Sequence, residues 1–164
     1  MQKKLIQRDE IKLVGLTTRT NNHNEMNPET GKIGGMIGEF FGNQWPTKIA
    51  HRKNPEVTLC VYTKYASDEH GDYTYFIGEE VSDFDHIPDG MKMLVIPASH
   101  YQKFTTPSGK IPSVVIQAWQ AIWKMTPEEL GGKRAYQADF EVYDQRAQDP
   151  QNCIVDIYVG IEGS

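Results

Sequence analysis

The stretch MLVIPASHYQKF, residues 93–104, decides the fold, because the chain restarts its plan of elements there. Its apolar and β-branched residues predict a strand, and a turn (TPSG) follows it. The segment IPSVVIQAWQAIWKM at 111–125 has apolar residues at helical spacing, with Pro112 in the first turn. Two strands of a hairpin complete the half: AYQADFEVYD at 135–144 and CIVDIYVGIE at 153–162.

The first half has the same order of elements. A strand at 11–20 is followed by a polar loop at 21–31 and by an apolar, Gly-rich segment at 32–45, KIGGMIGEFFGNQW, which predicts a helix closed by Pro46. The segments VTLCVYTKY at 57–65 and DYTYFIGEEV at 72–81 then predict a hairpin.

Matching residue pairs support a duplication. Leu13-Val14 aligns with Leu94-Val95, and Val61-Tyr62 with Val142-Tyr143, both pairs being 81 residues apart, and YFIGEE at 75–80 resembles IYVGIE at 157–162. We therefore predict an α+β fold of two duplicated β-α-β-β units with pseudo-twofold symmetry, whose antiparallel sheet carries two helices. Residues 1–164 would form a single domain, with repeats at about 5–85 and 90–164.

Composition excludes several classes of function. A net charge of −5 with scattered Lys and Arg argues against a direct nucleic-acid partner. The longest apolar stretch, 93–98, is too short to span a membrane, and residues 1–10 lack a signal-peptide pattern, so we expect a cytoplasmic protein. The chain has two cysteines and five histidines, and no two histidines have helical or metal-ligand spacing. They therefore predict neither a disulfide framework nor a metal site, and no cofactor is expected.

Glu141 interrupts a strand whose other residues are apolar, and in the duplication it takes the position of Cys60. A buried, unpaired carboxylate costs several kcal/mol, so it must face water, carry a partner, hold a proton or await a ligand. Alternation places Tyr143 on its face, and we expect Tyr158 of the neighbouring strand beside it as well. An acid among aromatic rings suits an organic cation. The alternatives are a solvent-facing glutamate or an ion pair with Arg134 or Arg146.

The chain resembles the GyrI-like effector-binding family, found as the ligand-binding domain of AraC-type and MerR-type multidrug-responsive regulators and as stand-alone integron cassette proteins. The resemblance rests on MLVIPASHYQKF, the following SG and Trp-containing helix, DFEVYD, and the terminal VDIYVGIE. It implies a groove between the two halves that takes lipophilic, often cationic, small molecules, with the acid matching Glu141 at its bottom. The aromatic residues it implies around the groove are Tyr143, Tyr158, Trp119, Phe40, Phe41, Trp45, Tyr62 and Phe76. Core packing is the alternative role for Trp119, Phe40 and Phe41.

Three functions remain open on the sequence. The first and favoured one is a small-molecule binder or sensor rather than an enzyme, because no nucleophile or metal motif is visible. The second is a small hydrolase using Glu141 and a nearby Tyr. The third is a protein-protein inhibitor of DNA gyrase, as the family name suggests. Since no DNA-binding helix-turn-helix precedes residue 1, we expect any role in transcription to need a partner protein.

Overall fold

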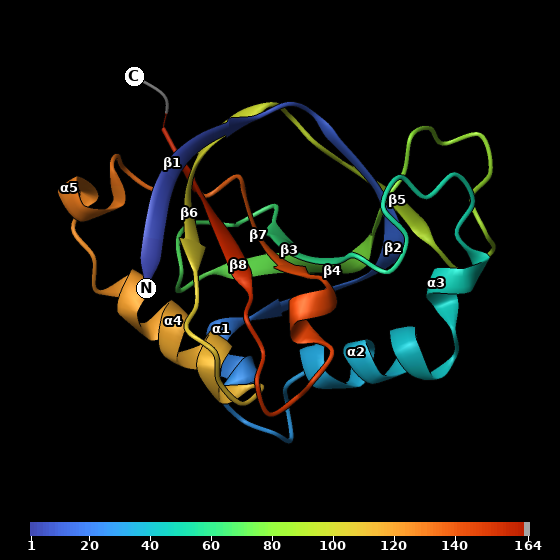
Figure 1. The fold of residues 1–164 in the computed structure, drawn as a ribbon, viewed down its shortest axis with the longest axis horizontal. Coiled ribbons are helices and arrows are strands. Elements are labelled where there is room, and N and C mark those ends of the chain that lie inside the picture. The colour runs from blue at the N-terminus through green and yellow to red at the C-terminus, as the bar shows by residue number, and fades with distance from the viewer. Residues whose placement is uncertain (163–164) are drawn as a thin grey trace.

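The computed structural model describes residues 1–162, and its centre is an eight-stranded antiparallel sheet with the order β1-β6-β8-β7-β3-β4-β2-β5 (Figure 1). Strands and turns follow one another along the chain much as expected, and both predicted hairpins form. The strands are β1 (Gln2–Arg8), β2 (Ile11–Asn21), β3 (Thr58–Thr63), β4 (Asp72–Glu80), β5 (Lys92–Ile96), β6 (Ser99–Thr105), β7 (Ala138–Tyr143) and β8 (Asp156–Ile161).

The order of strands confirms the duplicated plan. From the β7–β3 pair at the centre, each side continues through the last strand of its own unit (β8 or β4) to the first one (β6 or β2). The alignment of Leu13 with Leu94 is wrong, however. Leu94 lies in β5 and is the direct cross-strand partner of Leu13, so the two residues are neighbours in the sheet rather than counterparts in the two repeats.

The predicted strand at 93–104 is in fact two strands, β5 and β6, that pair in different halves of the sheet. Pro97 lies at the break and has no backbone N–H to donate, so the ladder between β5 and β2 ends at Ile96. β1, which the sequence did not reveal, pairs with β6 of the second unit, while β5 pairs with β2 of the first. Each unit therefore receives its outermost strand from the other.

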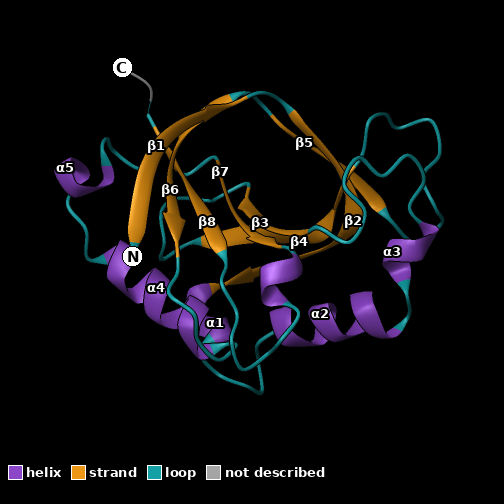
Figure 2. Ribbon diagram, in the orientation of Figure 1, coloured by secondary structure: helices purple, strands orange, loops and turns teal. Residues whose placement is uncertain are grey.

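The two long helices lie on the same side of the sheet (Figure 2). α2 begins at Ile33 and ends at Gly42, and α4 begins at Ser113, after Pro112, and ends at Trp123. Pro46 does not close α2 as predicted: it lies in the first turn of a separate short helix, where its missing N–H costs nothing. The short helices are α1 (Asn22–Glu25), α3 (Trp45–Lys48) and α5 (Pro127–Leu130), with a 3-10 turn at Gln145–Ala147.

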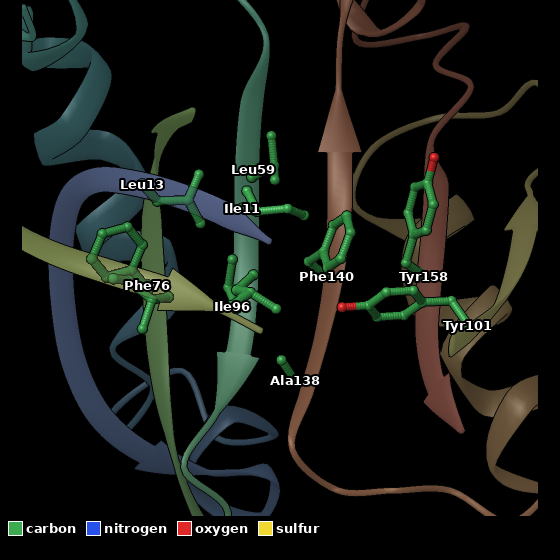
Figure 3. Close-up of a cluster of buried hydrophobic side chains, with 11 residues drawn as sticks. Ile11, Leu13, Leu59, Phe76, Ile96, Tyr101, Ala138, Phe140 and Tyr158 are labelled. Carbon is green, nitrogen blue, oxygen red and sulfur yellow. The ribbon is translucent and has the colours of Figure 1, made fainter. Parts of the chain in front are cut away.

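The sheet curves, and its concave face holds its own apolar cluster (Figures 1 and 3). Phe76, Tyr101, Phe140 and Tyr158 point into that cluster, and the rings of Phe140 and Tyr158 stack with centroids 4.5 Å apart. The opposite face meets the helices. α4 buries five side chains there, whereas α2 buries only Phe40.

Within residues 1–162, the structure contains no helix that is both long enough and apolar enough to cross a bilayer.

Candidate functional site

A cavity of about 930 Å³ lies between the sheet and the two long helices. Its floor is formed by residues of β3, β4 and β7, and its walls by α2 on one side and α4 on the other. Successive side chains of a strand point to opposite faces, so every second residue of these three strands reaches the cavity. The floor residues are Thr58, Cys60, Tyr62, Tyr73, Tyr75, Ile77, Glu141 and Tyr143.

Glu141 on β7 is the most buried charged group of the cavity, with 2% of its surface exposed. The indole N–H of Trp119 donates to its Oε2 over 2.7 Å. The hydroxyl of Tyr62 donates to the same oxygen over 2.8 Å, and that of Tyr143 to Oε1 over 2.6 Å. Three neutral donors from β3, β7 and α4 therefore converge on one carboxylate. A solvent-facing Glu141 is thus excluded.

The Glu141 carboxylate has these hydrogen bonds but no cation. Within residues 1–162, no Lys, Arg or His nitrogen lies within 4.0 Å of its oxygens. The suggested partners are engaged elsewhere: Arg134 pairs with Asp139 over 2.6 Å, and Arg146 with Asp144 and Asp156. Burial raises the pKa of Glu141, although the donors from Tyr143, Trp119 and Tyr62 oppose that rise.

Aromatic rings surround the carboxylate on the floor of the cavity. The ring of Tyr62 lies at the centre, with its centroid 5.5 Å from that of Tyr73, 5.5 Å from that of Tyr75 and 5.6 Å from that of Trp119. All three contacts are edge-to-face, so the rings present both faces and edges to the space between them. The pKa of Tyr62 is raised well above its ordinary value by burial and by the Glu141 charge, so its phenol keeps its proton.

The charges around the cavity are mostly negative. Five acidic side chains line it, and the one basic side chain among its lining residues, Arg134, is bound to Asp139. Of these acids, Asp144 forms an ion pair with Arg146, and Glu25 accepts hydrogen bonds from the backbone N–H groups of Lys32 and Ile33 at the start of α2. Glu141 has no cationic partner within the described residues, and acidic side chains outnumber basic ones in the lining of the cavity.

The cavity brings together five of the nine predicted site residues. Glu141, Tyr143 and Tyr62 lie on the floor, Trp119 lies on the α4 wall and Phe41 on the α2 wall. Trp119 and Tyr62 also pack in the core, so the two roles weighed for Trp119 are not exclusive.

Two predicted residues, Tyr158 and Phe76, lie on the other face of the sheet. Tyr158 is the cross-strand partner of Phe140, and Ile157 that of Glu141, so the expectation that Tyr158 lies beside the acid is wrong. Figure 3 shows Tyr158 and Phe140 side by side in the concave cluster, with Phe76 in the same cluster. Alternation along each strand was predicted correctly, but the register between strands decides which faces coincide.

Two further predicted residues lie away from the cavity. Phe40 is completely buried in the core beneath α2. Trp45 packs against Gly90 and beneath the ammonium group of Lys48, 4.4 Å from its ring centroid. Neither belongs to the lining of the cavity, which makes Phe41 the only aromatic contribution of α2 among the described lining residues.

Sequence reasoning missed Tyr73 and Tyr75 on β4 and Tyr65 after β3, although all three line the cavity. A signal was present: tyrosines alternate along DYTYF, which places two of them on one face of the strand. Cys60 was read as a small buried hydrophobe, which it is, and it lies directly opposite Glu141 on the neighbouring strand.

This geometry can be compared with known proteins. Residues 4–161 match the model of the Cass2 family, described as integron-associated effector binding protein. The chain belongs to the Cass2 family. A second comparison agrees with that assignment: YobU of Bacillus subtilis (strain 168), which is named as a transcriptional regulator, is 30% identical to this Cass2 protein over 151 residues, covering 92% of each chain. The resemblance found in the sequence is thereby confirmed.

Solved structures with the same fold include another Cass2-type protein. The integron cassette protein from the mobile metagenome of Vibrio cholerae superposes with a TM-score of 0.77 at 26% identity, over 98% of this chain and 95% of that one. SAV2435, solved bound to tetraphenylphosphonium, gives a TM-score of 0.77 at 17% identity, over 99% of this chain and 95% of its own. At that identity the similarity concerns the fold alone.

Proposed function

We propose that this protein binds lipophilic organic cations in the cavity between α2 and α4, with Glu141 as their countercharge. One observation carries the proposal: a fully buried carboxylate accepts three neutral hydrogen bonds and has no cation near it within the described chain. Such a group is costly in an empty protein and becomes favourable once a positive charge enters. SAV2435, which shares the fold, was solved with the cation tetraphenylphosphonium, and that supports the same class of ligand here.

The aromatic floor explains why the cation would be organic and lipophilic. Ring faces attract a cation by about 0.5 to 2 kcal/mol each, while a small hydrated metal ion would have to shed water for few oxygen ligands. Two walls of apolar side chains add burial of apolar ligand surface, at roughly 25 cal/mol per Å². Association itself costs at least about 4 kcal/mol, so the charge contribution of Glu141 decides between weak and useful affinity.

A role as a small hydrolase is the second candidate, and the contacts of Glu141 argue against it. A carboxylate that acts as a general base needs a free acceptor position beside the attacking water. Protein donors occupy three of the four acceptor positions of the Glu141 carboxylate, two at Oε2 and one at Oε1, which leaves one position on Oε1. We therefore infer that a bound cation leaves the cavity chemically unchanged. Any regulatory action through a partner protein would start from this binding event.

The test compares the wild type with Glu141→Gln. Glutamine keeps the shape, its oxygen can accept from Trp119 and Tyr62, and its amide can donate to the Tyr143 hydroxyl after that hydroxyl rotates. We expect affinity for tetraphenylphosphonium or benzyltrimethylammonium to fall about 10- to 100-fold, corresponding to roughly 1.5 to 3 kcal/mol. Neopentylbenzene, the neutral carbon isostere of benzyltrimethylammonium, should lose almost nothing.

Titration calorimetry on both proteins with the charged and neutral pair gives the answer. Equal losses for both ligands, or no loss for either, would show that Glu141 is not the countercharge. Chromatography of the ligands after prolonged incubation completes the experiment: a hydrolysed ester analogue whose turnover disappears in Glu141→Gln would favour the hydrolase instead.

A further inference from the structure

The mouth of the cavity carries an apolar surface that the proposed cation site leaves unused. Four large apolar side chains line the cavity and yet lie open to solvent; we call them the rim, and they are Met26 (76% exposed), Phe41 (51%), Ile116 (50%) and Trp123 (40%). Single exposed hydrophobic residues are ordinary on protein surfaces, whereas a group at one opening marks a binding surface.

The rim spans both walls. Phe41 is on α2, Ile116 and Trp123 are on α4, and Met26 follows α1. The rim residues line the same cavity as the floor that carries Glu141. The exposed apolar surface of the rim is therefore continuous with the floor.

We propose that the rim is a second subsite, which holds the unbranched apolar tail of a cationic amphiphile whose positive headgroup lies over the aromatic floor. This inference rests on the proposed function, because the headgroup uses the Glu141 site. The floor and the rim line one cavity, so one elongated molecule can touch both. The five acidic side chains around it disfavour an anionic amphiphile, and a neutral one would gain nothing from Glu141.

The experiment varies the tail and keeps the headgroup. Butyl-, octyl- and dodecyltrimethylammonium are titrated into the protein below their micelle concentrations. Full burial of a methylene contributes about 0.8 kcal/mol, so affinity should rise by up to about fourfold for each added methylene until the tail passes the rim. Dodecyl maltoside, which has the tail without the charge, should bind much more weakly than dodecyltrimethylammonium.

Two exposed rim residues provide the variants. Phe41→Gln and Ile116→Gln alter side chains that are half exposed, so folding should be retained. We expect each to weaken dodecyltrimethylammonium about tenfold while changing butyltrimethylammonium less than about twofold. Met93→Gln is the matched control: Met93 is 57% exposed but lies on β5, outside the cavity lining, and its substitution should change neither ligand.

The outcomes separate the two proposals. If none of the ammonium ions binds, the proposed function fails and the tail subsite with it. If butyl and dodecyl ions bind with equal affinity, or rim variants weaken both equally, the countercharge remains and the tail subsite is wrong. Sedimentation of the ligand-free protein tests whether a second copy of the chain covers the rim. A dimer that Phe41→Gln dissociates would assign the rim to that second copy and overturn the proposal.

Discussion

The helices α2 and α4 hold equivalent places in the two repeats, yet they pack very differently. α4 buries five side chains against the sheet, and its Trp119 donates a hydrogen bond to Glu141. α2 buries only Phe40, and four of its ten residues are glycine. Each helical glycine costs roughly 1 kcal/mol relative to alanine, so α2 is held weakly by its own sequence and by its contacts. α4 is therefore the more firmly packed wall of the cavity, and α2 the less firmly packed one.

This difference bears on the proposed cation site. A wall with few buried contacts can shift at low cost, whereas a wall anchored in the core keeps the donors in place. The two helices thus contribute differently to the cavity: α4 donates a hydrogen bond to the carboxylate, and α2 lines the other wall with only one buried side chain.

The largest expected difference between α2 and α4 comes from truncating one isoleucine in each helix. Ile122→Ala removes a fully buried side chain of α4 and should lower the free energy of unfolding by about 2 to 4 kcal/mol. Ile37→Ala alters a half-buried residue of α2 and should cost about 1 kcal/mol or less. Urea unfolding of both variants measures the difference. Equal losses would mean that α2 is anchored as firmly as α4.

A second test uses the pH dependence of stability. Burial raises the pKa of Glu141 above its ordinary value of 4.5. Between pH 4.5 and that raised pKa, the native state therefore holds a proton that the unfolded chain has released. The contribution of Glu141 to stability is present below pH 4.5 and is lost as the pH rises through the raised pKa, by up to about 1.4 kcal/mol per pH unit. Urea midpoints across this range should fall for the wild type relative to Glu141→Gln; parallel curves would contradict the assignment.

The pH dependence of stability also distinguishes the α4 wall of the cavity from the α2 wall. Trp119→Phe removes a donor that lowers the pKa of Glu141, so the pH range over which stability is lost should extend upwards. Phe41→Leu, on the α2 wall, removes no hydrogen bond to the carboxylate and should leave that range unchanged. If both variants shift it equally, α4 has no special hold on Glu141.

The smallest expected effect concerns the glycines of α2. A Cβ on Gly38 would meet nothing within 4 Å, so Gly38→Ala gains helix propensity without a clash and should stabilise the protein by about 0.5 to 1 kcal/mol. Ala118→Gly on α4 should instead destabilise it by at least as much. Thermal unfolding of both variants checks this, and a destabilised Gly38→Ala would indicate that α2 needs the flexibility of glycine for its native conformation.

Much of this fold was readable from the sequence, because hairpins and apolar periodicity are local signals. The order of elements, both long helices and the unusual position of Glu141 all followed from such patterns. The failures came where partners far apart in the chain decide the outcome. The polar strand β1 was missed because its partner β6 lies far away in the chain. Tyr158 was placed beside Glu141 because neither strand alone specifies the register of β7 against β8.

The site residues also divide into those with a local sequence signal and those that depend on distant parts of the chain. An acid within an apolar strand is conspicuous by itself, so Glu141 and its near neighbour Tyr143 were found. Trp45 and Phe40 were placed near the groove because they belong to the first helical region, but α2 ends at Gly42 and turns Trp45 towards Gly90. The tyrosines of β4 were overlooked because their role depends on β3 lying beside β4 and on β7 lying on the other side of β3.

The exchange of β1 and β5 between the two halves also governs how the chain can be made. β1 is synthesised first, yet its pairing partner β6 follows the entire first repeat in the chain, so β1 stays unpaired until both strands have left the ribosome. Until β5 follows, the outer side of β2 is an open strand edge that can capture another nascent chain. Neither half can therefore complete its part of the sheet from its own strands alone, and the eight-stranded sheet forms only once both repeats are available.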